Sequence, residues 1–262
     1  MNELHDASPY QSATTAEQFA AHLAAVRARI AAACARAGRD SNSVRLLPVS
    51  KTVTAERIRL AVAGGCTELG ENKVQEALEK SIALADLPLR WVIIGHLQRN
   101  KAKFVARFAS EFQALDSLEL AAILQQKLQD ENRTLRVLVQ VNTSGEASKF
   151  GLEPATVASF IRELPAFPRL EVRGLMTLAI LDGNEARVRR CFQRLRELRE
   201  QLRIQIRAEG LIGIGMDELS MGMSGDFEIA IEEGATIVRV GQAIFGPRAL
   251  PDSHYWPEPA AH

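Results

Sequence analysis

Cysteine is scarce in this sequence, and the spacing of the few cysteines argues against a zinc site and against a disulfide framework. Cys34, Cys66 and Cys191 are odd in number and far apart along the chain. A zinc site needs closely paired ligands, and a disulfide framework needs an even count of cysteines. We therefore expect no metal site, and we expect a protein of the reducing cytoplasm.

The sequence also lacks a net charge and a long apolar run. Its 32 basic and 32 acidic side chains balance, so no overall field attracts it to nucleic acid or to an anionic membrane. No stretch approaches the roughly 18 apolar residues of a membrane helix, and residues 1–6 lack the features of an export signal. We expect a soluble protein with no membrane or nucleic-acid partner, so any anion site must be local.

One local excess of positive charge lies between residues 187 and 207, which contain eight arginines. Arginine clusters can bind nucleic-acid phosphates. Here, however, the arginines flank an apolar stripe at helical spacing, and Glu197 and Glu200 lie among them. This arrangement favours the solvated face of an outer helix over a nucleic-acid site.

The chain has a regular middle between two polar ends. Residues 1–13 are unpatterned, and residues 249–262 contain three prolines, so we predict flexible tails around one domain at 14–248. A single barrel commonly has about 250 residues, so the length requires no second domain.

Helices and strands alternate within this domain. An amphipathic helix is predicted from Thr15 to Gly38, outside the barrel. The eight apolar segments that follow are predicted to be strands and lie at about 44–51, 67–70, 90–94, 112–115, 137–141, 170–175, 218–221 and 236–240. Helical segments separate most of them. The sequence thus predicts an α/β fold, a single (β/α)8 TIM barrel with an extra amino-terminal helix, with an open doubly wound sheet as the alternative.

Lys51 is the leading candidate for chemistry because it ends the first predicted strand and Thr54 begins a helix shortly after it. In such barrels, functional groups gather at the carboxyl ends of the strands. A lysine amine placed there can form a Schiff base with an aldehyde. The alternative is an ordinary loop charge, and Lys51 alone does not decide between the two.

A glycine-containing segment, residues 220–226, follows the seventh strand, where barrels commonly hold phosphate. Its glycines allow a ligand to approach the backbone closely, and Ser224 is predicted to begin a helix that exposes unpaired N–H donors. Asp226 and Glu228 lie in the same predicted first turn and must point away from a bound anion.

A second glycine-containing loop follows the eighth strand. Gly241 and Gln242 lie in it, and strand alternation turns Arg239 toward the barrel mouth. For either loop taken alone, an ordinary turn is the alternative. Two such loops opposite Lys51 favour a phosphate site.

Five motifs together carry a resemblance to a known family, and it extends from about residue 20 to 248. They are Val49-Ser50-Lys51, Gly70-Glu71-Asn72 with Val74-Gln75-Glu76, Ile94-Gly95-His96-Leu97-Gln98 with Asn100-Lys101, Ser220-Met221-Gly222-Met223-Ser224, and Val238-Arg239-Val240-Gly241 with Ala243-Ile244-Phe245-Gly246. The chain resembles the pyridoxal phosphate homeostasis proteins. That family is similar to the barrel of alanine racemases without its second domain, and its members bind pyridoxal 5'-phosphate (PLP) and help to maintain vitamin B6 balance.

The resemblance implies a role for each candidate cofactor-binding residue. Lys51 would carry PLP as a Schiff base, Asn72 would lie near the ring, and Arg239 would lie near the pyridine nitrogen or the phosphate. The candidates expected to line the phosphate are Ser224, Gly241 and Gln242, and Met221 is a further candidate cofactor-binding residue. Many relatives have a small hydroxyl or a basic residue in place of Gln242, so we expect a backbone contact there and not a side-chain contact.

The residues favour a PLP carrier or regulator over an enzyme. Arginine has no acceptor, so Arg239 at the pyridine nitrogen would weaken carbanion chemistry. Tyr10 and Tyr255, the only tyrosines, lie in the predicted tails, away from a racemase-like acid–base position. His96 and Asn142 follow strands, and we interpret both as loop residues and not as catalytic groups.

Three hypotheses follow. The favoured one is a monomeric PLP carrier or regulator without strong turnover, with PLP-dependent apo-enzymes as candidate partners. The second is a PLP-dependent amino-acid racemase or decarboxylase of the same barrel class. The third is a barrel that binds another phosphate, with Lys51 incidental.

Overall fold

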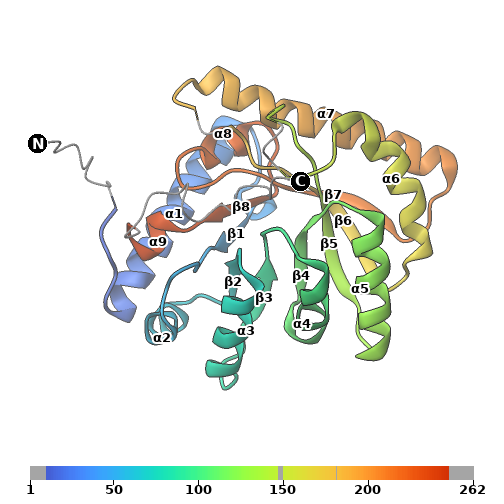
Figure 1. Cartoon of the computed structure of the whole chain (residues 1–262). Coiled ribbons are helices and arrows are strands. Elements are labelled where there is room, and N and C mark those ends of the chain that lie inside the picture. Colours follow the sequence, from blue (N-terminus) through green and yellow to red (C-terminus); the bar gives the residue numbers. More distant parts are fainter. Residues whose placement is uncertain (1–9, 147–149, 181, 248–262) are drawn as a thin grey trace, which may run out of the picture.

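The computed structural model describes residues 10–146, 150–180 and 182–247, and these residues form a parallel barrel (Figure 1). Eight strands lie in the described residues, and they pair in the order β1-β8-β7-β6-β5-β4-β3-β2, every pair parallel. The strands are β1 (Arg45–Pro48), β2 (Glu68–Glu71), β3 (Arg90–Ile93), β4 (Glu111–Leu115), β5 (Leu135–Gln140), β6 (Leu170–Met176), β7 (Ile214–Ser220) and β8 (Ile237–Val240). The predicted (β/α)8 barrel is confirmed, and the open doubly wound sheet is wrong.

The barrel closes between its first and second strands. Val49 bridges Gly70, and the Ser50 amide donates to the Gly70 carbonyl at 3.0 Å. Because this contact lies at the carboxyl ends of β1 and β2, the closure of the barrel is one residue from Lys51. A Cβ at Gly70 would lie 3.3 Å from a methyl group of the Val49 side chain, so glycine lets the two strands approach here without displacing Val49.

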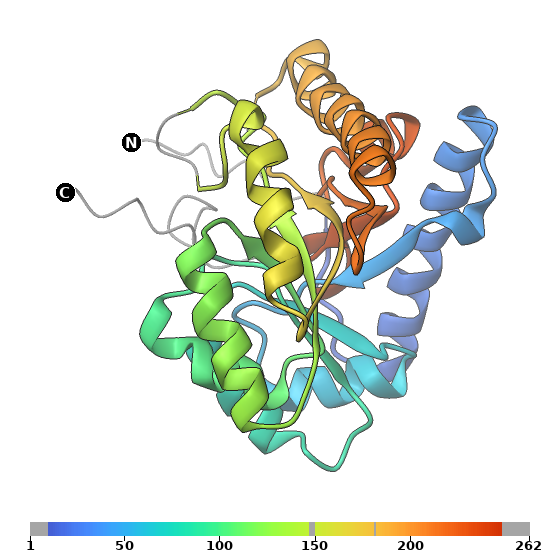
Figure 2. The same ribbon diagram turned by 90° about the vertical axis from the view of Figure 1, so that its right-hand side faces the viewer.

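The helices cover the outside of the barrel, and most of them connect one strand to the next. They are α2 (Ala55–Ala63), α3 (Val74–Ala83), α4 (Ala102–Phe108), α5 (Leu118–Asp130), α6 (Val157–Glu163), α7 (Glu185–Glu209), α8 (Phe227–Glu232) and α9 (Gln242–Phe245). Helices α6 and α7 lie side by side (Figure 2), joined by an ion pair between Arg162 and Glu209. On α7, Arg189 and Arg196 form ion pairs with the buried Glu233, so part of the basic cluster serves internal pairing.

The extra helix α1 (Ala16–Arg36) packs outside the barrel against α2, α8 and α9, as predicted. Its start is capped by Thr15, whose hydroxyl accepts the Gln18 amide. Phe19, Leu23 and Ile30 form its buried stripe.

The predicted amino-terminal tail was too long, because residues 10–13 contact the barrel. Ala13 is fully buried, and its carbonyl accepts a hydrogen bond from Arg57. The Tyr10 hydroxyl donates to the Ser224 carbonyl at 3.1 Å. Residues 1–9 and the predicted tail at 249–262 lie outside the described residues, so those parts of the tail prediction stay predictions.

Candidate functional site

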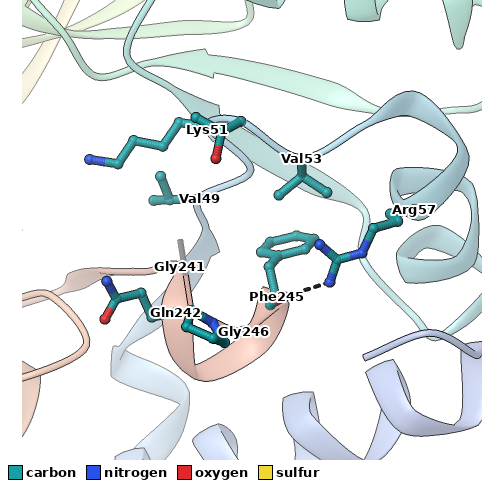
Figure 3. A pocket seen from close by; sticks show the side chains of 10 residues that line it. Val49, Lys51, Val53, Arg57, Gly241, Gln242, Phe245 and Gly246 are labelled. Carbon is teal, nitrogen blue, oxygen red and sulfur yellow. Dashed lines mark hydrogen bonds between the residues drawn. The ribbon is translucent and has the colours of Figure 1, made fainter. Parts of the chain in front are cut away.

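Lys51 lies in a turn directly after β1, and its side chain is buried at the barrel mouth. Only 4 % of the residue is exposed. It lines two adjoining cavities of about 350 Å³ and about 230 Å³, which also share Val49, Gly241 and Gln242. In Figure 3 the Lys51 side chain extends away from Arg57 and Phe245, which line the smaller cavity. A buried amine thus faces a space large enough for a small ring compound.

The larger cavity brings together six of the seven predicted site residues. They are Lys51, Asn72, Ser224, Arg239, Gly241 and Gln242. The seventh, Met221, is fully buried, and neither cavity is lined by it. Residues from four strand ends therefore meet in one place, although they lie up to 191 positions apart in the sequence.

The loops after β7 and β8 contact each other directly. The Gly241 amide donates to the Ser224 hydroxyl at 3.3 Å, which holds the two loops together at the cavity wall. The Tyr10 hydroxyl binds the Ser224 carbonyl from outside, and Tyr10 lines neither cavity. Tyr10 is thus part of the folded structure and not of a loose tail, but its hydroxyl is bound to a backbone carbonyl and does not reach an acid–base position in the cavity. Tyr255 lies outside the described residues.

Gly222 allows the first of these loops to turn back onto α8. Its φ is +93°, a backbone conformation that is unfavourable for residues other than glycine. A Cβ at this position would lie 2.6 Å from the Ala230 Cβ and 2.8 Å from the Phe227 Cα. The positive φ and the lack of room for a Cβ both require glycine at position 222, which explains one residue of the 220–224 motif.

Two expectations about this loop were wrong. Helix α8 begins at Phe227, so Ser224 lies in the preceding turn and not at the helix start. Asp226 lines the larger cavity, although it was expected to point away from it. The reason for both is a hydrogen bond of 2.6 Å from the Met223 amide to the Asp226 carboxylate, which closes the turn before the helix begins. Burial raises the pKa of Asp226, whereas the Met223 amide and the charge of Arg239 lower it.

Glu228, by contrast, faces away from the cavity. Its carboxylate pairs with Arg29 and Arg36 of α1 on the outer surface. The expectation for Glu228 is therefore confirmed.

Arg239 is a cation that lines the larger cavity, and it is 3 % exposed. Its guanidinium donates to the Ser220 hydroxyl at 2.7 Å and to the Thr177 carbonyl at 2.8 Å. Burial lowers the pKa of Arg239 to about 10, and the negative charge of Asp226 acts in the opposite direction. The guanidinium therefore stays charged near neutral pH.

A chain of hydrogen bonds continues from Arg239 through the barrel interior. The Ser220 hydroxyl donates to the Gln113 side-chain oxygen at 2.6 Å, and the Gln113 amide group donates to Glu111 at 2.5 Å. Glu111 is paired with Arg45 at the other end of the barrel. In this series of hydrogen bonds Arg239 donates to Ser220, Ser220 donates to Gln113, and Gln113 donates to Glu111. The series therefore fixes the orientation of the Arg239 guanidinium.

Asn72 reaches the cavity just after β2, where the backbone that follows β3 passes very close to it. A Cβ at Gly95 would lie 2.2 Å from the Asn72 carbonyl oxygen, so only glycine permits this approach. Asn72 is 8 % exposed.

Next to Lys51 lies a buried ionic cluster that the sequence analysis missed. The Lys80 ammonium contacts Glu71, Glu76 and the Ser50 carbonyl at 2.7, 2.6 and 2.7 Å. Glu71 is fully buried, and one of its oxygens has no hydrogen-bond partner among the described residues. Burial raises the pKa of Glu71 to about 7, against the effect of Lys80 and of the Ser50 hydroxyl. The i,i+4 spacing of Glu76 and Lys80 is the signal that could have indicated this cluster.

His96 and Asn142 were interpreted as loop residues. The His96 ring stacks on Phe150 with 4.1 Å between ring centroids, and its Nδ1 lies 3.9 Å from Asp116. The Asn142 side chain donates to the Glu146 carbonyl. Neither residue lines the two cavities.

The described part of the chain contains no group of three or more histidine, cysteine or acidic residues that could hold a metal ion. Its three cysteines are buried and unpaired. None of its helices combines the length and the apolar character that crossing a membrane requires.

Comparison with known proteins finds a matching domain family and individual proteins of similar sequence. The profile of the alanine racemase N-terminal domain matches residues 21–249. A pyridoxal phosphate homeostasis protein of Aquifex aeolicus is 43 % identical over 226 residues, which cover 86 % of this chain and 96 % of that protein. The corresponding protein of Pseudomonas aeruginosa is 43 % identical over 230 residues, covering 88 % and 96 %.

Solved structures agree with this similarity. PipY of Synechococcus elongatus, in a structure with PLP bound, has a TM-score of 0.75 and 33 % identity, covering 87 % of this chain and all of PipY (100 %). An alanine racemase of Clostridium difficile has a TM-score of 0.66 at 13 % identity, covering 90 % of this chain and 58 % of the racemase. The racemase likeness supports the fold alone.

Replacing Gly222 by alanine should destabilise the protein by roughly 1–3 kcal/mol, because the new Cβ meets α8 and the backbone is in the left-handed region. Gly225→Ala in the same loop is the matched control, since no atom lies within 4 Å of a Cβ there. Urea unfolding of both variants measures the difference. Equal stability of the two variants would contradict this interpretation of the loop.

The buried carboxyl of Glu71 should make stability depend on pH. Because the pKa of Glu71 is raised from 4.5 to about 7 on folding, the stability it contributes is complete below pH 4.5 and is lost as the pH rises through about 7. Urea unfolding from pH 4.5 to 8 should therefore show a smaller decline for Glu71→Gln than for the unmodified protein. Parallel curves for the two proteins would show that Glu71 keeps an ordinary pKa.

Proposed function

Because this chain belongs to the family of pyridoxal phosphate homeostasis proteins, within the alanine racemase N-terminal domain family, we propose that it binds PLP on Lys51. In this proposal it acts in vitamin B6 and PLP homeostasis as a carrier or regulator. The observation that carries the proposal is the buried Lys51 amine, which faces the cavity enclosed by the loops after β7 and β8.

The residues around this cavity fit the chemical groups of PLP. PLP would supply an anionic phosphate and an aldehyde, with which an amine can condense with loss of one water. Lys51 offers the amine, and it lines the same cavity as Arg239. Arg239 offers a fixed positive charge, which favours an anionic ligand in a chain of zero net charge.

We assign the phosphate side of the cavity to Ser224, Gly241 and Gln242. Ser224 and Gly241 already bond to each other, so an arriving anion would share or replace that weak 3.3 Å contact. Gln242 lines both cavities and is partly exposed, so we expect its backbone to serve the ligand. Asn72 is assigned to the ring. Met221 is assigned an indirect role through packing, since it lines neither cavity.

We propose that the chain is not an enzyme with strong turnover. Arg239 has donors only, so at the pyridine nitrogen it could not hold a proton there as a carboxylate does. The chain of hydrogen bonds to Ser220 and Gln113 keeps this guanidinium in place. The racemase or decarboxylase alternative rests on fold similarity at 13 % identity, which does not transfer an activity.

The remaining parts of the proposal concern the cell. We propose a cytoplasmic monomer that exchanges PLP with PLP-dependent apo-enzymes and binds no nucleic acid. Three unpaired buried cysteines are compatible with a reducing compartment. The described residues are accounted for by one barrel and its extra helix, without a separate dimerising domain.

Borohydride reduction of the protein mixed with PLP tests the attachment residue. Mass spectrometry should find one PLP-derived mass on the peptide containing Lys51, and Lys51→Ala should lose the adduct. Lys127→Ala, a change at a partly exposed lysine on α5, is the matched control and should keep it. An adduct that persists in Lys51→Ala would contradict the proposed attachment.

A further inference from the structure

The turn that carries Lys51 contains a strained backbone. The Val53 amide donates to the Ser50 carbonyl at 3.0 Å, which makes Lys51 and Thr52 the two central residues of a four-residue turn. Thr52 has a φ of +68°. Type II turns require a positive φ at this position and normally place glycine there, whereas a β-branched residue is an outlier. Something outside the turn must hold Thr52 in this conformation.

The cluster of Lys80, Glu71 and Glu76 contacts the turn on both sides of Lys51. The Thr52 amide donates to Glu76 at 2.6 Å. On the other side, the Ser50 hydroxyl donates to Glu71 at 2.6 Å, and the Ser50 carbonyl accepts from Lys80 at 2.7 Å. The residues before and after Lys51 are thus tied to one buried group of charges.

The same cluster crosses the closure of the barrel. Ser50 follows β1, Glu71 ends β2, and both Glu76 and Lys80 belong to α3. Backbone hydrogen bonding between the ends of β1 and β2 is limited, in the part of the chain that the structure describes, to the region of Val49, Ser50 and Gly70. Side-chain bonds from the cluster therefore supplement the closure at the point where the Lys51 turn begins.

From these contacts we infer that Lys80, Glu71 and Glu76 form a positioning clamp that holds the Lys51 turn and directs the Lys51 amine into the cavity. None of the three lines the cavity, so they act through Ser50 and Thr52. This inference rests on the proposed function, because it concerns the residue to which PLP is proposed to attach.

The clamp also explains why one of two neighbouring buried lysines serves as the carrier. Lys80 is 7 % exposed and Lys51 is 4 % exposed, so burial alone does not distinguish them. Lys80 makes three hydrogen bonds as donor, which only an ammonium with its three protons can do. An ammonium has no lone pair with which to attack an aldehyde, so Lys80 is excluded from the covalent chemistry while it is clamped.

Glu76→Gln is the variant that tests the clamp. Its side chain is 26 % exposed, so the change leaves no deeply buried charge without a partner, unlike Lys80→Met. We expect PLP affinity and the rate of borohydride trapping on Lys51 to fall about tenfold, the scale of a lost hydrogen bond to a charged group. In the protein without PLP, hydrogen exchange of the Thr52 amide should become faster.

Glu79→Gln is the matched control, since it makes the same chemical change on the exposed face of α3. It should leave PLP affinity, trapping on Lys51 and exchange at Thr52 unchanged. Unfolding in urea of both variants separates a positioning effect from general destabilisation. Glu76→Gln should lose PLP affinity well beyond any difference in stability between the two.

The possible outcomes separate the clamp from the proposed function. If Glu76→Gln binds and traps PLP as the unmodified protein does, with unchanged exchange at Thr52, the clamp is overturned. If the unmodified protein forms no adduct on Lys51, the proposed attachment fails, and exchange at Thr52 in the two variants still decides whether the clamp holds the turn.

Discussion

The closure of the barrel between β1 and β2 is the constraint on which the site depends. Val49 and Gly70 meet there, and Lys51 follows two residues after Val49. Because a closed barrel brings all strand ends to one rim, the same closure places Lys51 beside the loops after β7 and β8. An open sheet with the same strands would separate these residues. The position of the amine is therefore a property of the whole fold.

Two buried cations inside this barrel, Arg239 and Lys80, are stabilised by hydrogen bonds to specific partners. Arg239 is held by Ser220 and Thr177, and the chain of bonds continues through Gln113. Lys80 is held by two carboxylates and a carbonyl beside the Lys51 turn. A buried charge without such partners would be costly. The first arrangement presents a cation to the cavity, and the second orders the turn that presents an amine.

The sequence was sufficient to predict the fold, Lys51, the two glycine-containing loops and the direction of Arg239, because these depend on local patterns. Asn72 and Met221 were indicated only by the family resemblance. Alternating apolar segments indicated the strands, and the end of one strand indicated Lys51. Strand alternation correctly turned Arg239 toward the cavity. These predictions need only the direction of side chains on a strand and the rim of a barrel.

The features that the sequence analysis missed depend on contacts between distant segments. Tyr10 packs against the Ser224 loop 214 residues away. Asp226 lines the cavity, and its carboxylate accepts a hydrogen bond from the Met223 amide. The amino-acid sequence alone does not indicate this direction of the side chain. Glu71 lies at the end of β2, and its partner Lys80 is on the following helix. Only the folded chain shows which charges meet.

A crystal structure of the protein grown with PLP would test the central claim most directly. We expect continuous density between the Lys51 amine and the ligand, with the phosphate between Ser224 and Gly241 and with Arg239 in contact with the ligand. A ligand bound elsewhere, or one in the cavity with the Lys51 amine turned away from it, would contradict the account.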